Sequence, residues 1–441
     1  GITTLANSGG QVFGSVSGIT ISSGATLALG ASNQINDAAN LTLSGGTLNV
    51  GSFSETMRQL SQTTASSIDY LNDGSVLRFN GVNGSVSGLG TVTGTLTIAN
   101  WAGSLQGSGT EQLIVYSPSG APTVSNTTFA DWGAATTLAR TDLGANFYEI
   151  LPTFTATYWH LDSATSQTWN NNTGTWSNST GVAATQPNSA NAIVILGDIQ
   201  TAGAPIALAN NQIINVDGGG AARTIGKLLF ENSADKNYTL NSSAGDRLNF
   251  DVTGGQAQII VNDDGSHVIN APVRSNDAML VTNNSASATG LTIAGTFDQR
   301  YTGNLTFNGG GTTLVSGAIT QGSGATNLVK TGDGTLVLSS ASSSYTGTTT
   351  LRSGTIEIDA NAPSGAAGAL GNSTSAIIVN DASTTAAMNT SLLIGATGVT
   401  VGRAVTVGSQ GDVTTLGGNI ASGTGTFSGT VTLNKSVDLT A

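Results

Sequence analysis

The sequence predicts an all-β fold built as a parallel β-helix, that is, a β-solenoid of short stacked strands. Three observations predict it: a short aliphatic–polar–aliphatic unit recurs along most of the chain, Gly-, Asn- or Ser-rich corners separate the units, and helical patterns are nearly absent. Only 5% of the 441 residues are aromatic and 9% are charged, which is typical of a repetitive fold. Hydrophobic residues still make up 38%, enough apolar surface for the chain to fold.

The recurring unit indicates a strand with one buried face, because apolar and polar residues alternate in it at period two. Such strands are too short to cover the face of a sandwich. Stacked coils solve this problem, since each strand bonds to the coils above and below and the aliphatic residues form one column. We expect about 20 to 25 residues per coil. Instances are Ile19–Ile21, Leu41–Leu43, Leu48–Val50, Leu96–Ile98, Leu291–Ile293, Leu305–Phe307, Leu336–Leu338 and Ile356–Ile358.

The corners between strands carry residues that accept a positive φ angle at low cost. They include Gly24, Gly45–Gly46, Asp73–Gly74, Asp217–Gly218, Asp264–Gly265, Gly309–Gly311 and Gly354. One segment, Ser52–Ser61, has a helix-like pattern, because Ser52 and Glu55 have the spacing of a capping box. The segments on both sides of it read as strands, so we expect extended structure there and keep a helix as the alternative.

Composition argues against several kinds of site and partner. The chain has no Cys, which excludes disulfides, thiolate metal sites and a cysteine nucleophile. A net charge of −12 repels phosphate backbones, so we expect no nucleic acid partner. No apolar run approaches the roughly 20 residues that cross a bilayer, so we expect no direct membrane insertion. Gly-rich stretches such as Gly218–Gly220 lack the Gly-Lys-Ser/Thr of a phosphate loop, and no cofactor is expected.

Catalytic and metal-binding residues are not expected either. Asn262–His267 offers two carboxylates and a histidine for acid–base chemistry, but a tight corner between two strands explains the same residues, and we favour the corner. His160 is the other histidine of the chain. Corner aspartates could bind a calcium ion, which stays an alternative, but the sequence has neither an EF-hand spacing nor a repeated Gly-Gly-x-Gly-x-Asp nonapeptide. These aspartates are Asp217, Asp263, Asp264, Asp333 and Asp412.

Tyr158, Trp159, Trp169 and Trp176 concentrate aromatic rings in a chain that has few of them. Two interpretations stay open for this group. The rings could close the open end of an aliphatic column, which we favour, or they could be exposed and stack on sugar rings as a glycan contact.

A longer motif gives a more specific signal. The order of Lys330, Gly332-Asp333-Gly334-Thr335-Leu336, Tyr345-Thr346-Gly347 and Gly354-Thr355-Ile356 resembles the autotransporter-associated β-strand repeat, also called the passenger-associated transport repeat. The resemblance covers residues at about 328–360, and looser relatives occur at Tyr301–Leu305 and Phe427–Leu433. It implies a right-handed parallel β-helix in a large secreted protein of bacterial surfaces.

Two further segments resemble pieces that accompany this repeat. Gly107–Pro152 resembles a closing segment, and the Trp-containing segment that begins at Tyr158 resembles an opening one. We therefore predict two consecutive solenoid segments, residues 1–157 and residues 158–441, joined by the Trp-containing segment.

These observations lead to an expected role. We expect a structural extracellular fibre or stalk at the cell surface, and not an enzyme. Unpaired strand edges at the terminal coils would let identical chains stack head to tail into filaments. An adhesin or a module that binds surface glycans is the alternative, supported by the aromatic group. A polysaccharide lyase or hydrolase is a third possibility, which rests on fold analogy and on Asp263 and Asp264.

Overall fold

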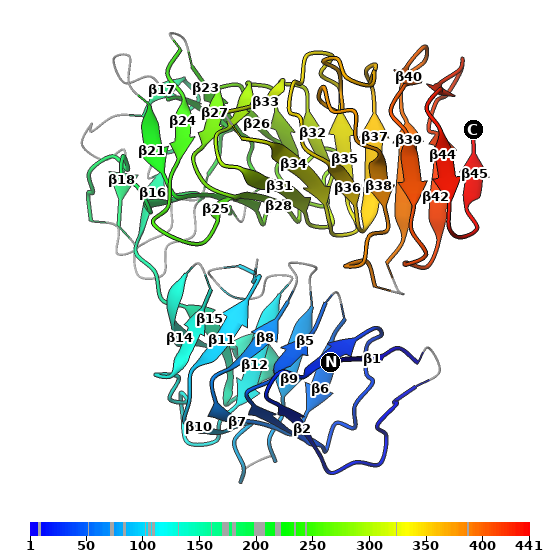
Figure 1. The fold of residues 1–441 in the computed structure, drawn as a ribbon. Coiled ribbons are helices and arrows are strands. Elements are labelled where there is room, and N and C mark those ends of the chain that lie inside the picture. Colours follow the sequence, from blue (N-terminus) through cyan, green and yellow to red (C-terminus); the bar gives the residue numbers. More distant parts are fainter. Residues whose placement is uncertain are drawn as a thin grey trace. The chain divides into compact units, whose positions relative to one another are not determined.

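A computed structural model shows an all-β chain, as the sequence predicts (Figure 1). It describes residues 1–7, 10–51, 53–70, 75–82, 85–101, 103–104, 107, 111–130, 132–159, 161–169, 176–178, 182–197, 208–216, 222–232, 235–242, 245–322, 324–385 and 388–441. Within these residues helical structure is limited to one 3-10 turn, η1 (Thr141–Leu143). Two compact units are present, unit 1 (Gly1–Phe154) and unit 2 (Thr155–Ala441).

Unit 1 is a stack of coils with three parallel faces. The β1 face contains β1 (Ile2–Leu5), β3 (Thr26–Leu29), β5 (Thr47–Asn49), β8 (Ser66–Asp69), β11 (Leu96–Ala99) and β13 (Thr127–Phe129). The β2 face contains β2 (Gly18–Ser22), β4 (Asn40–Ser44), β7 (Gln59–Thr64) and β10 (Leu89–Val92). The β6 face contains β6 (Glu55–Met57), β9 (Val76–Phe79) and β12 (Gln112–Tyr116).

An antiparallel hairpin closes the last coil of unit 1. Its strands are β14 (Gly133–Ala139) and β15 (Phe147–Pro152), which pair with each other. β14 also pairs antiparallel with β13 on the β1 face, and β15 pairs antiparallel with β12 on the β6 face. The hairpin thus covers two strand edges that a parallel stack would leave open. A buried ion pair fastens it, because Arg140 Nη1 lies 2.6 Å from Glu149 Oε2.

Unit 2 has two long parallel faces and one shorter one. The β16 face contains β16 (Ala156–Trp159), β19 (Ile193–Leu196), β22 (Lys227–Phe230), β25 (Ala257–Val261), β28 (Met279–Asn283), β31 (Gly303–Asn308), β34 (Thr326–Lys330), β36 (Thr349–Leu351), β38 (Ile377–Val379), β41 (Val405–Val407) and β44 (Val431–Leu433), with β18 (Trp176–Ser177) antiparallel beside β16.

The β17 face contains β17 (Gln167–Thr168), β20 (Gln212–Asn215), β23 (Tyr238–Asn241), β26 (His267–Ile269), β29 (Leu291–Ile293), β32 (Thr313–Val315), β35 (Thr335–Leu338), β37 (Gly354–Ile358), β39 (Thr390–Ile394), β42 (Thr414–Gly418) and β45 (Asp438–Thr440). The third face contains β21 (Arg223–Ile225), β24 (Leu248–Phe250), β27 (Val273–Ser275), β30 (Phe297–Gln299) and β33 (Ile319–Gln321), and a separate pair, β40 (Thr400–Val401) and β43 (Thr426–Phe427), follows late in the chain.

The core of unit 2 is a set of in-register aliphatic columns. One column runs along the β17 face, where each coil places a buried residue directly over the previous one. Inward and outward residues alternate in every strand, and strands of successive coils are paired in register. Inward residues therefore lie over inward residues, and short strands together form a continuous apolar layer. This column consists of Ile214, Leu240, Ile269, Ile293, Val315, Leu338, Ile358 and Ile394.

Coil length varies more than the 20 to 25 residues that the sequence predicts. On the β16 face Val329 opposes Thr350, 21 residues further on, whereas Ala156 opposes Ile193, 37 residues further on. In unit 1 the range on the β1 face runs from 20 residues (Thr47 to Ser67) to 31 (Thr97 to Thr128). Corner segments account for the difference, since their length does not disturb the pairing of the strands they connect.

The helical alternative for Ser52–Ser61 is wrong. Ser52 lies outside the described residues, and the remainder of the segment forms β6 and most of β7. Both Met57 and Leu60 are fully buried in these strands, so core packing overrides the local capping-box pattern. No helix in the described part of the chain is long and apolar enough to cross a membrane.

Candidate functional site: the ends of the coil stacks and the repeat

The Trp-containing segment lies at the first coil of unit 2. Trp159 on β16 opposes Trp176 on β18 in an antiparallel pair, and their ring centroids are 5.0 Å apart with an edge-to-face angle of 84°. Trp169 contacts Trp176 at 4.8 Å and donates a hydrogen bond from Nε1 to the carbonyl of Pro187 at 3.2 Å. All three rings belong to the apolar core of unit 2 and cover its beginning.

The burial of these aromatic residues bears on both interpretations of the group, closure of the column and contact with a glycan. Trp159, Trp169 and Trp176 are at most 2% exposed, and Tyr158, which precedes Trp159 on β16, is fully buried. None of the four rings therefore presents a face to solvent on which a sugar could stack. Their packing at the first coil supports a role in closing the column, which stays a prediction about folding.

The polar corner Asn262–His267 is packed into the core of unit 2. His267 is fully buried, and its Nε2 lies 2.6 Å from Asp263 Oδ1. Its Nδ1 accepts a hydrogen bond from the backbone N–H of Tyr238, so Nε2 carries the proton and donates it to Asp263. The ring also stacks on Phe230 at a centroid distance of 4.3 Å.

Both carboxylate oxygens of Asp263 accept hydrogen bonds from neighbouring residues. Its Oδ2 accepts hydrogen bonds from the backbone and side-chain amides of Asn232, and its Oδ1 accepts one from the N–H of Gly265. Asp264 points elsewhere and accepts a bond from the N–H of Ala286. Of the three groups suggested for acid–base chemistry, His267 and Asp263 thus hold the corner together, and Asp264 binds the backbone of the next coil. His160 and Asp217 lie outside the described residues, within which no three His, Cys, Asp or Glu side chains are close enough to hold a metal ion.

The motif at Lys330 forms coil corners. Lys330 Nζ is buried and donates hydrogen bonds to the carbonyls of Thr331 and Gly332, the latter at 2.6 Å. Gly332 and Gly354 have φ angles of 66° and 73°, which favour glycine. A Cβ on Gly354 would lie 2.3 Å from the carbonyl oxygen of Gly332 in the previous coil.

The second half of the motif serves the same purpose. A Cβ on Gly347 would lie 2.1 Å from the carbonyl oxygen of Thr326, so the backbones of successive coils meet there. Tyr345 is fully buried, with its hydroxyl 2.9 Å from Thr349 Oγ1. The buried motif residues therefore specify how one coil packs on the next, whereas Asp333 and Thr346 of the motif are exposed.

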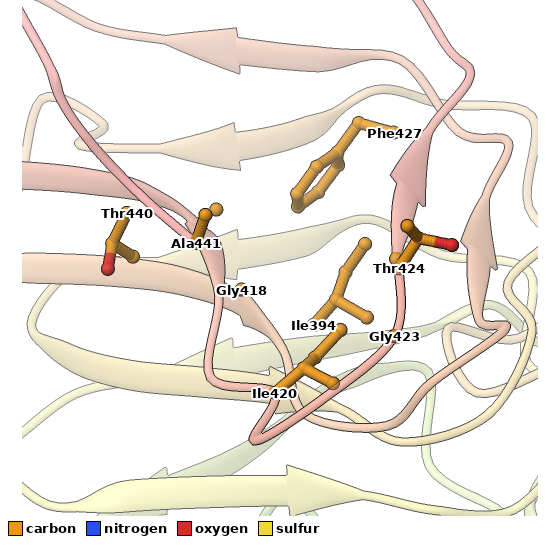
Figure 2. A pocket seen from close by; sticks show the side chains of 10 residues that line it. Ile394, Gly418, Ile420, Gly423, Thr424, Phe427, Thr440 and Ala441 are labelled. Atoms are coloured by element: carbon orange, nitrogen blue, oxygen red, sulfur yellow. The ribbon is translucent and has the colours of Figure 1, made fainter.

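The last coil of unit 2 contains a hollow of about 240 Å³, lined by Ile394, Ile420, Phe427 and the backbone of Gly418 (Figure 2). Gly418 opposes Ile394 in the register of the β17 face. It therefore takes the position that an aliphatic residue holds in all eight preceding members of the column. The missing side chain leaves the hollow open among its apolar neighbours.

Strand edges at this coil are unpaired. β43, β44 and β45 each pair with a strand of the preceding coil, and no described strand pairs with their other edges. Apolar side chains are exposed beside these edges: Val431 is 40% exposed, Leu433 48% and Leu439 80%. The edge of β1 in unit 1 is similarly open, since β1 pairs with β3 alone and Ile2 is 75% exposed.

Sequence reasoning missed the glycine in this column and a second hollow in unit 1. Gly418 could have been found, because Leu416-Gly417-Gly418 breaks the aliphatic–polar–aliphatic pattern of the other strands on its face. The hollow in unit 1 gives no such signal, since an antiparallel strand brings its residues together.

The fold and the motif together define a parallel β-solenoid that carries a coil-forming repeat. The family model of the passenger-associated-transport-repeat matches residues 328–358 and confirms the resemblance seen in the sequence. The chain therefore contains a repeat of autotransporter passenger domains, and this repeat implies a secreted or surface location. No curated protein and no solved structure matches the chain.

Proposed function

We propose that the chain is a structural segment of an extracellular surface fibre, which assembles head to tail with identical copies and has no catalytic role. The observation that carries the proposal is a difference between the ends of the two coil stacks. The end of unit 1 is closed by the β14–β15 hairpin and the start of unit 2 by β18 and its tryptophans. The β1 edge and the last coil of unit 2 have no such cover.

Open parallel edges favour the addition of further coils. A backbone N–H or carbonyl that points out of such an edge lacks its partner, and a second β-solenoid supplies partners for every second residue of the strand, the ones whose backbone groups point to that edge. At the last coil of unit 2 the gain includes apolar burial, because Leu433 and Leu439 would leave solvent. The contact joins different surfaces of two copies, so it does not close into a ring of two and it can extend into a filament.

The proposal that the chain has no catalytic role is supported by the contacts of His267 and Asp263. His267 and Asp263, the residues that most resemble an acid–base pair, contact each other within the corner and also accept hydrogen bonds from Tyr238 and Asn232 of the preceding coil. A role in the scaffold uses them fully, whereas general acid–base chemistry would need one of them to reach a substrate.

Sedimentation velocity and negative-stain electron microscopy of the purified chain test the assembly. We expect elongated particles whose length grows with protein concentration. Leu433→Lys and Leu439→Lys should abolish this growth, because each places a charge on the open end. Val182→Lys is the matched control, since Val182 is 61% exposed but lies away from that end in the chain, and it should assemble like the original protein. A chain that stays monomeric at every concentration contradicts the proposal, and so do edge variants that assemble normally.

A further inference from the structure

The second hollow lies in unit 1, on the outer side of the β6 face and next to the loop of the closing hairpin. It has a volume of about 550 Å³ and is lined by Asn80, Tyr116, Leu143, Asn146 and Phe147. Leu77 and Phe79 on β9 and Val115 on β12 point into the buried core, so the residues that alternate with them face outward. The hollow therefore lies outside the apolar core of unit 1.

Three of its residues form a row across three strands. Phe79 opposes Val115 in the parallel pair of β9 and β12, so Asn80 and Tyr116, which follow them, lie next to each other. Tyr116 in turn opposes Phe147 in the antiparallel pair of β12 and β15, with ring centroids 5.4 Å apart at 62°. The closing hairpin thus completes a row that the parallel coils alone do not make.

The backbone holds this row in place without help from a ligand. The N–H of Gly88 donates to the carbonyl of Tyr116 at 2.7 Å, and the N–H of Arg140 donates to the carbonyl of Phe147 at 2.8 Å. The N–H of Ser117 donates to the carbonyl of Asn146, also at 2.8 Å, which fixes the loop beside the hollow. A hollow formed in advance binds with little loss of conformational entropy.

One polar atom of the residues that line the hollow has hydrogen-bonding capacity that the described part of the protein leaves unused. Asn80 Oδ1 is buried and has no hydrogen-bond partner among the described residues. A buried acceptor without a partner is costly, and a ligand hydroxyl would satisfy it once a rotation of the Asn80 side chain brings Oδ1 to the surface of the hollow. Asn146 is exposed at the rim, and Arg78 lies over the Phe147 ring at 5.8 Å from its centroid.

We propose that this hollow binds one or two pyranose rings of a neutral glycan. A sugar combines an apolar face of C–H groups with a rim of hydroxyls, and the hollow combines a half-buried phenyl ring with two amides. Its volume is in the range of small-molecule sites. The chain carries a net charge of −12, which disfavours sialylated or uronic glycans. The site goes beyond the proposed structural role, because it gives the rod a surface that recognises a ligand.

A glycan microarray of neutral and acidic oligosaccharides, probed with the full chain, gives the first test, and calorimetry with the strongest neutral oligosaccharide on the array gives affinities. We expect binding to neutral glycans. Asn80→Ala should weaken it about tenfold, as expected for one lost hydrogen bond. Phe147→Leu should weaken it by a similar factor through the loss of ring contact.

Tyr301→Ala is the matched control, because Tyr301 is an aromatic residue of unit 2 that is 45% exposed, and its affinity should equal that of the original chain. Thermal unfolding followed by circular dichroism shows whether each variant folds. If Phe147→Leu does not fold, Asn80→Ala still decides, since its Oδ1 bonds to no described protein group. The proposal is overturned if no neutral glycan binds, if only acidic glycans bind, or if Asn80→Ala binds as tightly as the original chain.

Discussion

Replacing Gly418 by alanine is expected to stabilise the last coil of unit 2. Gly418 lies in a strand position whose eight predecessors in the column are aliphatic, and its φ angle is not in the region reserved for glycine. A Cβ built there would lie 3.7 Å from two carbon atoms of Ile420, which is ordinary van der Waals contact. The added methyl group therefore enters the hollow of Figure 2 without a clash.

The expected gain has two sources. Removing glycine reduces the freedom of the unfolded chain, which contributes about 0.4–1 kcal/mol. Burying one methyl group contributes about 0.8 kcal/mol more. Together they predict a gain of about 1–2 kcal/mol in the free energy of local opening, and hence amide exchange about tenfold slower in this coil.

Hydrogen–deuterium exchange followed by mass spectrometry measures this effect directly, because peptides from residues 414–441 report on the last coil alone. Gly417→Ala provides the opposite control. Gly417 has a φ angle of 151°, and a Cβ there would lie 1.9 Å from the carbonyl oxygen of Thr440, so this variant should detach β45 and speed exchange. If Gly418→Ala exchanges faster than the original chain, or if the two variants behave alike, the column argument is refuted.

Three further predictions concern buried polar groups. Burial raises the pKa of Glu55 to about 7 despite the backbone N–H groups that bond to it. The contribution of this carboxyl group to the stability of unit 1 should therefore be greatest below about pH 4.5, and it should be lost as the pH rises through 7. Glu55→Gln should reduce the change in the unfolding free energy of unit 1 with pH by on the order of 1–2 kcal/mol. Thermal melts from pH 5 to 8 measure this change, and a variant with the same pH profile as the original chain would contradict the prediction. Lys330→Met should destabilise unit 2 by about 1–3 kcal/mol in denaturant titrations, because the carbonyls of the corner lose their donor, whereas a neutral effect would mean that water replaces the ammonium. Arg403 is fully buried and donates to the carbonyls of Leu370 and Ser375, so Arg403→Leu should free residues 361–376 for limited proteolysis, and a cleavage pattern like that of the original chain would refute this role.

The sequence predicted the local structure well, because that structure has short-range causes. Pairs such as Leu41 and Leu43 need only alternation to become the buried face of a strand, and both are fully buried. Gly24 and Gly354 have φ angles of 72° and 73°, as their corner positions predict. The repeat at residues 328–358 was recognisable because its glycines and lysine have fixed offsets over two successive coils.

The helix alternative at Ser52–Ser61 and the estimate of coil length failed for two different reasons. A capping-box pattern is worth about 1 kcal/mol, while burying Met57 and Leu60 in the core of unit 1 is worth several times more. Corners can also absorb extra residues without altering the register of the strands, so the sequence between two strands does not reveal the spacing of the coils.

The sequence by itself determined that the chain forms short strands with one apolar face, and that such strands must stack to bury it. Only the tertiary structure decided which coil lies over which, because partners in parallel strands are 20 to 47 residues apart and many strands have nearly the same pattern. That pairing buried the tryptophans, placed Gly418 at the end of an aliphatic column, and joined Asn80, Tyr116 and Phe147 in one row. Contacts of this kind depend on register between distant segments, which local sequence patterns do not encode.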